Sequence, residues 1–134
     1  EMGAARRNVN PWTWQDNMAF SQATEVRSPG RVVWCAGQSS MDAEGNAVHA
    51  GDMAAQITQS LDNLEEVLRK AEMSLSSLVR LNIYTTDIDQ FFAAHEVLAK
   101  RLSAAGCQPP GSLLGVARLA FPDLLVELEA TAAD

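Results

Sequence analysis

The sequence has 134 residues, of which 47% are hydrophobic and 20% charged; these proportions fit one globular domain and exclude a disordered chain. Its formal net charge of −7 repels phosphate backbones and disfavours nucleic-acid binding. No apolar run reaches the roughly 20 residues that cross a bilayer, and the polar start lacks the apolar segment of a signal peptide. We therefore expect a cytoplasmic protein without membrane contact, with one domain over 1–134 and an N-terminal arm over 1–15.

The first half of the chain predicts two strands and a helix. The strand-like runs 20–27 and 31–38 are joined by Ser28-Pro29-Gly30, a turn signal. Because residues 31–36 are apolar on both faces, we expect a central strand there. Asp52 then begins a helix with a regular apolar stripe, formed by Met53, Ile57, Leu61, Leu64, Leu68 and Ala71.

The second half predicts a strand, a helix and two closing strands. Residues 78–84 alternate in polarity, and Asp87 with Gln90 resembles a capping box that begins a helix ending at Gly106. One closing strand follows Pro109-Pro110-Gly111, and the other covers 124–130. In the last strand Glu127 and Glu129 share the face opposite the apolar residues.

This order predicts an α+β fold in which two helices pack on one face of a mixed sheet, with hairpins at both ends. Two helices cannot cover two sheet faces. Since the 31–36 run is apolar on both sides, we expect the uncovered face to be substantially apolar and to be buried in an oligomer.

Neither metal nor cofactor is expected. His49 and His95 have no potential ligands at suitable spacing, and Gly37 and Gly45 fit no phosphate-binding loop. The cysteines, Cys35 and Cys107, form no Cys-x-x-Cys motif and are expected to be buried thiols.

Several residues admit both a structural and a functional interpretation. His95 lies on the apolar stripe of its helix and fits either the core or a cleft wall. Phe20 is a core or pocket-wall residue. Gly37 ends a strand, where it forms a bulge or allows a ligand or another backbone to approach closely. The indoles of Trp12 and Trp14 are expected to anchor the arm to the body.

The two glutamates are open to the same choice. Each either pairs with a cross-strand arginine, for which Arg80 and Arg118 are candidates, or belongs to a site. The structural interpretation is stronger for Glu129 than for Glu127.

Seven segments in order along residues 10–132 resemble the RidA family, also called the YjgF or L-PSP endoribonuclease family. The segments are Asn10-Pro11, Phe20-Ser21-Gln22-Ala23, Cys35-Ala36-Gly37-Gln38, Asp52-Met53-Ala54-Ala55-Gln56, Gln59-Ser60-Leu61-Asp62-Asn63-Leu64, Val116-Ala117-Arg118-Leu119 and Val126-Glu127-Leu128-Glu129-Ala130.

The resemblance implies a chorismate-mutase-like α+β fold and a homotrimer with clefts between subunits. Active members hydrolyse 2-imino or enamine acids to 2-keto acids and ammonia. In such members a pocket arginine binds the substrate carboxylate, while a glutamate and backbone carbonyls position the attacking water.

Carried over by position, the family's glutamate matches Glu127 and its close-approach glycine matches Gly37. A common tyrosine corresponds to Phe20, a helical asparagine to His95 and a cysteine to Leu113. The arginine itself corresponds to Gly111, and neither glycine nor water replaces a guanidinium that binds a carboxylate. We therefore expect weak activity on 2-imino acids, unless another cation, such as Arg80 from the same or a neighbouring subunit, has taken the arginine's place.

Three functions remain open. The first is an imine or enamine hydrolase without a carboxylate anchor, in which Glu127 positions water, His95 acts as acid or base, and six residues contact the substrate. These are Phe20, Gly37, Gln38, Tyr84, Gly111 and Leu113. The second is a non-catalytic small-molecule-binding or chaperone-like trimer. Endoribonuclease activity is third, because the chain is acidic.

Overall fold

Two long antiparallel strands form the centre of the sheet in the computed structural model, which describes residues 5–134; the first four residues of the predicted arm lie outside the described residues. These strands are β5 (Leu78–Thr85) and β7 (Val126–Ala133). The strand order is β3-β7-β5-β6, with β3 (Val32–Trp34) and β6 (Leu113–Gly115) at the edges. The short β4 (Gln38–Ser39) also pairs with β7.

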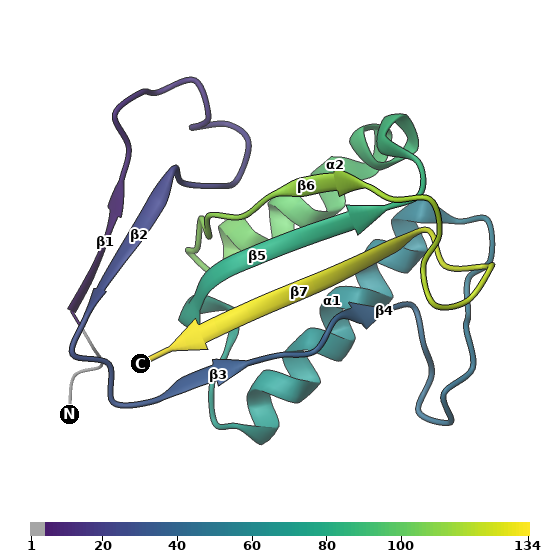
Figure 1. The fold of residues 1–134 in the computed structure, drawn as a ribbon, viewed down its shortest axis with the longest axis horizontal. Coiled ribbons are helices and arrows are strands. Elements are labelled where there is room, and N and C mark those ends of the chain that lie inside the picture. The colour runs from purple at the N-terminus through teal and green to yellow at the C-terminus, as the bar shows by residue number, and fades with distance from the viewer. Residues whose placement is uncertain (1–4) are drawn as a thin grey trace.

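Both helices cover the same face of this sheet, so the predicted α+β class is confirmed (Figure 1). Helix α1 (Met53–Lys70) begins where Asp52 accepts a hydrogen bond from the Ala55 amide at 3.0 Å. Helix α2 (Ile88–Ala104) begins in the same way, with the Gln90 amide donating to Asp87 at 2.9 Å. Such caps satisfy amides that have no partner within the helix. A 3₁₀ turn, η1 (Leu75–Ser77), leads into β5.

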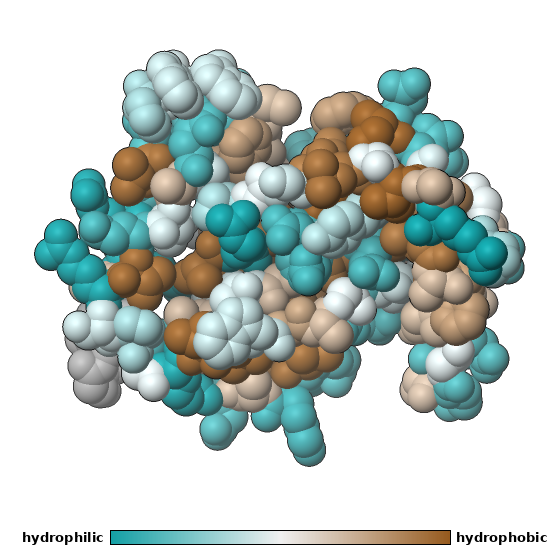
Figure 2. All heavy atoms as spheres, viewed as in Figure 1, coloured by the Kyte–Doolittle hydropathy of each residue, from teal (hydrophilic) through white to brown (hydrophobic). Residues whose placement is uncertain are grey.

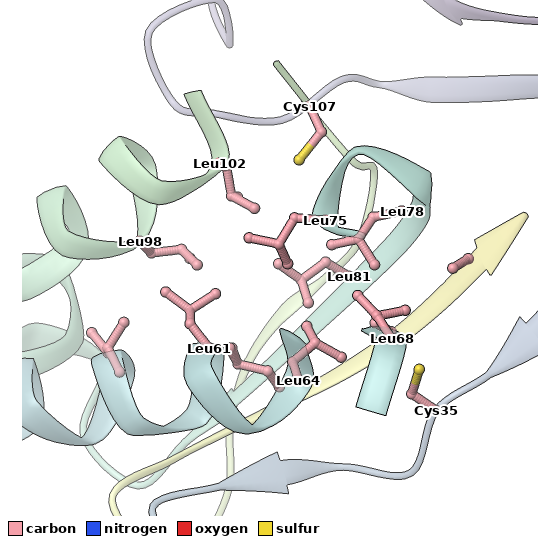
Figure 3. Packing of buried hydrophobic residues seen from close by; sticks show 14 of the residues in the cluster. Cys35, Leu61, Leu64, Leu68, Leu75, Leu78, Leu81, Leu98, Leu102 and Cys107 are labelled. Atoms are coloured by element: carbon pink, nitrogen blue, oxygen red, sulfur yellow. The ribbon is translucent and has the colours of Figure 1, made fainter. Parts of the chain in front are cut away.

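The core lies between the helices and the sheet (Figure 3). Leucines of both helices point toward one another there, and they contact β5 and the buried apolar side of β7. Cys35 and Cys107 are buried free thiols, as expected. Burial raises the pKa of Cys107 to about 11, because a thiolate is poorly solvated in an apolar site. Among residues 5–134, no helix is long and apolar enough to cross a membrane.

The two closing strands do not form a hairpin, contrary to our expectation. Strand β5 lies between them and pairs with β6 in parallel and with β7 in antiparallel. The crossover through α2 explains the parallel pairing, because a helix that returns along the sheet brings the next strand into the same direction. The loop 116–125 then carries the chain to the other side of β5.

The predicted central strand over 31–38 is also wrong. Residues 35–37 interrupt it, and β3 is an edge strand that pairs with β7 alone within the described chain. Val33 packs against the core, whereas Val32 and Trp34 face the side without helices. Trp34 is 77% exposed. The run is apolar on both sides because one side is uncovered by this chain, not because the strand is central.

A further hairpin stands apart from the main sheet and was only half predicted (Figure 1). Strand β1 (Ala5–Val9) pairs with β2 (Ala23–Arg27). β1 was missed because its sequence is polar and exposed. The strand expected from residue 20 begins only at Ala23.

The hairpin expected between β2 and β3 is absent because the connection between them is fixed elsewhere. The Gly30 amide donates to the Asp134 carbonyl at 2.7 Å. Arg31 pairs with the Asp134 carboxylate at 2.6 Å and donates to the Ala71 carbonyl at 2.8 Å. These bonds hold residues 30–31 between α1 and β7, so β2 leaves the sheet instead of folding back on β3.

The two N-terminal tryptophans do not anchor the arm. Trp12 and Trp14 are 57% and 62% exposed. Gln15, which has no exposed surface, organises this loop instead, because its amide donates to the Trp12 carbonyl at 2.9 Å and accepts from Gln22 at 3.1 Å. A buried amide must satisfy its polar atoms locally, and here that requirement closes the loop.

The sheet face without helices has a polar centre, which differs from the substantially apolar face that we expected (Figure 2). The register places Asn82 opposite Glu129 and Tyr84 opposite Glu127. Trp34 on β3 lies to one side of these residues, and Leu114 on β6, 49% exposed, lies to the other. The face therefore combines a polar middle with apolar edges.

Candidate functional site

The predicted site residues lie in two groups on opposite faces of the sheet. Glu127 and Tyr84 lie on the face without helices, and Gly37 contacts Glu127 there. With Asn82 and Glu129 they form what we call the carboxylate cluster. Phe20, His95, Gly111 and Leu113 line a cavity on the other side, the helix-side pocket, beside α2 and β6.

Glu127 lies directly against Gly37. A Cβ atom added to Gly37 would lie 2.1 Å from Glu127 Oε2, so any side chain at position 37 would force the Glu127 carboxylate to move. The close approach predicted at this glycine is thus made by a carboxylate of the same chain, rather than by a ligand or another backbone. The missing side chain leaves room for Glu127 on β7 beside the β3–β4 connection.

Glu129 is held by neutral hydrogen-bond donors and not by the predicted arginines. The Tyr84 hydroxyl donates to Glu129 Oε1 at 2.6 Å and the Asn82 amide donates at 3.2 Å. The bond from Tyr84, followed by that from Asn82, lowers the pKa of Glu129, and the same carboxylate raises the pKa of Tyr84. Within residues 5–134, neither Arg80 nor Arg118 forms an ion pair with either glutamate.

The remaining residue predicted on this side is turned away from the cluster. The Gln38 side-chain amide donates to the carbonyl of Ala36 at 3.2 Å. It therefore supports the bulge that follows β3. The Tyr84 hydroxyl is engaged by Glu129, so this tyrosine acts on a ligand only if that bond is exchanged.

The helix-side pocket has a volume of about 180 Å³ and is mainly apolar. His95 lines it from α2 and makes an edge-to-face contact with Phe91, with ring centres 5.8 Å apart. Burial lowers the pKa of His95 from its usual 6.5, because a buried imidazolium is poorly solvated. His95 thus belongs to the apolar stripe of α2 and also lines a cavity, so it has features of both the core residue and the cleft-wall residue that the sequence allowed.

Gly111 has no room for any side chain. A Cβ atom built there would lie 1.7 Å from the carbonyl oxygen of Leu81. The clash arises because the neighbouring residues pair closely with β5: the Leu81 amide donates to the Pro110 carbonyl at 2.9 Å, and the Ile83 amide donates to the Ser112 carbonyl at 2.8 Å. The arginine expected from the resemblance is incompatible with this backbone.

Sequence reasoning missed two walls of the pocket. Met18 belongs to the loop of the N-terminal hairpin, and Phe92 lies one residue off the apolar stripe of α2. Both are large apolar residues that remain exposed, at 39% and 51%, and such exposure is only visible in three dimensions. In the described part of the chain, no three His, Cys, Asp or Glu side chains are grouped to hold a metal ion.

The architecture defines a class: an α+β protein whose two helices cover a mixed sheet, with a strand glutamate lying against a glycine. The model of the Endoribonuclease L-PSP family matches residues 15–134. The chain belongs to this family, the RidA/YjgF family that the sequence motifs resemble.

Related proteins agree with this assignment. The chain is 30% identical over 113 residues to a RutC family protein of Pyrococcus abyssi, covering 84% of each. It is 30% identical over 79 residues to the 2-iminobutanoate/2-iminopropanoate deaminase of Rattus norvegicus, covering 59% of this chain and 56% of that one. Protein mmf2, mitochondrial, of Schizosaccharomyces pombe is 42% identical over 83 residues, and the match spans only 62% of its length.

Solved structures show the same fold. The Rid protein YyfB of Yersinia pestis, itself of unknown function, superposes with a TM-score of 0.82 at 38% identity, over 96% of this chain and 98% of that chain. The YjgF gene product of E. coli superposes with a TM-score of 0.69 at 25% identity, over 85% and 87% of the two chains.

Proposed function

We propose that this protein hydrolyses a small imine, enamine or related labile metabolite that carries no carboxylate near the reacting centre. Relatives named as imine deaminases support the reaction class. The geometry of Gly111 supports a substrate without a carboxylate, because a backbone that leaves no room for a Cβ atom leaves no room for a carboxylate-binding arginine at this position. Without a cation, a buried carboxylate loses far more hydration energy than it regains.

Glu127 is the proposed group for positioning water. Its carboxylate accepts a proton from the water as the water oxygen bonds to the imine carbon. The substrate nitrogen takes up that proton to give a carbinolamine. It then takes up the carbinolamine's hydroxyl proton as the carbon–nitrogen bond breaks, so that ammonia leaves and a carbonyl product remains. A neutral His95 is suited to transfer that proton near neutral pH.

This assignment requires more than one subunit. Glu127 and His95 lie on opposite faces of the same sheet, so one chain cannot bring both to one substrate. We propose a homotrimer in which the carboxylate cluster of one subunit faces the helix-side pocket of its neighbour across a cleft. The exposed Trp34 and Leu114 on the face without helices support burial of that face. The free thiols favour a cytoplasmic location, where thiols stay reduced.

The test measures ammonia release from a neutral imine or enamine and from 2-iminobutanoate, each generated in the assay by an oxidase. We expect acceleration with the neutral compounds and at least a tenfold lower kcat/KM with 2-iminobutanoate. Glu127→Gln should lower the rate on the neutral compounds about a hundredfold, as loss of general-base catalysis typically does.

Glu129→Gln is the matched control, since it changes the same type of side chain on the same strand and face. We expect it to keep the rate within about threefold, because Glu129 is engaged by Tyr84 and Asn82. No acceleration with any neutral imine or enamine, or full activity in Glu127→Gln, would contradict the proposal.

A non-catalytic binding protein is the second candidate, and the uncharged lining of the helix-side pocket favours it. This function predicts ligand-dependent thermal stabilisation that is unchanged in Glu127→Gln, with no turnover. RNA cleavage, the activity in the family's description, is disfavoured by the net charge of −7.

A further inference from the structure

The helix-side pocket differs from the carboxylate cluster in chemistry, and we infer that it binds an uncharged, ring-sized apolar group carrying one polar atom directed at His95. This inference rests on the proposed function only where it takes the bound group to be part of the reacting substrate. Binding to this pocket is measurable without turnover.

The volume sets the size of the ligand group. The pocket holds about 180 Å³, and an apolar protein cavity of about 150 Å³ stays dry and binds benzene. One six-membered ring therefore fits inside the pocket. The rims formed by Met18 and Phe92 are partly exposed, which leaves the pocket an entrance from solvent.

The walls set the polarity. Among residues 5–134 of this chain, the pocket lining contains no Lys, Arg, Asp or Glu, so a carboxylate entering it would lose its hydration without gaining a cation from the lining. Phe20 and Phe92 contribute aromatic surfaces to the lining, which favour edge-to-face or offset contact with a flat ring. Gly111 excludes any cation from its own position, because Leu81 occupies the space of a Cβ.

His95 sets the position of the polar atom. Its pKa is lowered by burial, so the ring is neutral near neutral pH and has one donor and one acceptor nitrogen. A hydroxyl, imine nitrogen or amine on the ligand can pair with a ring nitrogen that faces the pocket. A purely apolar ring would still enter the pocket but would gain no hydrogen bond from the histidine.

The experiment titrates the full chain with phenol, toluene and benzoate and follows methyl chemical shifts by NMR, with thermal shift as a second readout. We expect phenol and toluene to perturb Leu113, Leu98 and Ile83, and benzoate to bind at least tenfold more weakly than phenol. His95→Leu should weaken phenol binding about fivefold, which is the typical value of one hydrogen bond, and leave toluene unchanged.

Leu113→Trp fills the pocket and should abolish binding of all three probes, while Leu113→Met keeps the volume and should retain it. If Leu113→Trp fails to fold, the His95→Leu comparison still decides. Benzoate binding as tight as phenol, or shifts confined to residues outside the pocket, would overturn the inference. Ring binding with no turnover would overturn only the proposed function, and turnover without ring binding would overturn only this inference.

Discussion

The absence of a Cβ atom at Gly111 determines both the backbone pairing beside β5 and the charge of the helix-side pocket. A Cβ atom there would lie 1.7 Å from the Leu81 carbonyl oxygen. The backbone would have to move apart where two hydrogen bonds join residues 110–112 to β5. Gly111 is therefore a position where the backbone itself excludes a side chain.

We predict that Gly111→Ala lowers the free energy of unfolding by about 3 kcal/mol, measured by urea denaturation, because the backbone must shift in a packed region. Gly111→Arg should be at least as destabilising and should not raise activity on 2-iminobutanoate.

Gly30→Ala is the control for this comparison. A Cβ at Gly30 would lie 3.6 Å from the nearest atom, the Asp134 carbonyl oxygen, so this variant should be neutral or slightly stabilising. A Gly111→Ala protein as stable as Gly30→Ala would contradict the assigned contact.

The sequence identified candidate residues for the site, but it did not reveal which atoms these residues contact. Motif order singled out Glu127 and Gly37, but nothing in the sequence reveals that they touch. Arginine partners were expected for Glu129, and Tyr84 and Asn82 take that role instead. Hydrogen bonds across strands depend on register, which is set by long-range packing.

Among the elements, α1 does more than cover the sheet. Gln56 is fully buried in it and clamps two loops. Its amide donates to the carbonyls of His49 at 3.1 Å and Asp123 at 2.8 Å, and its carbonyl accepts from the Leu125 amide at 2.8 Å. The loop that leads into β7 is thereby fixed to the first turn of the helix.

We predict that Gln56→Leu lowers the free energy of unfolding by about 3 kcal/mol, because three backbone groups lose their hydrogen bonds to a fully buried amide. Chemical denaturation measures this loss. Gln59→Leu, the same change on the same helix, removes only a bond to Asn63 and should cost under about 1 kcal/mol. Equal losses of unfolding free energy in the two variants would show that the hydrogen bonds from Gln56 to the two loops add no stability.

The helices were predictable and the N-terminal strands were not, for physical reasons. Apolar spacing and the caps at Asp52 and Asp87 are local signals, and both helices begin where these signals indicate. The path of β2 depends on Arg31 reaching Asp134 and the end of α1. Such contacts join distant parts of the chain, so no local pattern reports them.

At the scale of the molecule, the sheet face without helices and the free edges of β3 and β6 are unpaired within the described chain. Trp34 lies where this face meets the β3 edge and is 77% exposed. Exposed edges and large apolar side chains are liabilities for an isolated chain, and assembly would remove both.

We predict that the protein sediments as a trimer and that Trp34→Ser raises the dissociation constant at least tenfold, since buried tryptophans often dominate interfaces. Trp14→Ser is the control, because Trp14 is similarly exposed but lies on the N-terminal loop. Analytical ultracentrifugation over a range of concentrations makes the comparison. A monomeric wild-type protein at all concentrations would exclude the assembly on which the proposed catalytic pairing depends.

The contact between Gly37 and Glu127 has a consequence for evolution. Any side chain gained at position 37 would occupy the volume of the Glu127 carboxylate, so the two positions are not free to vary independently. Among relatives that keep the glutamate at position 127, we expect glycine at position 37 to predominate. A lineage that loses this glycine would have to place the carboxylate elsewhere, so one substitution far from position 127 in the sequence would change the geometry of the proposed chemistry.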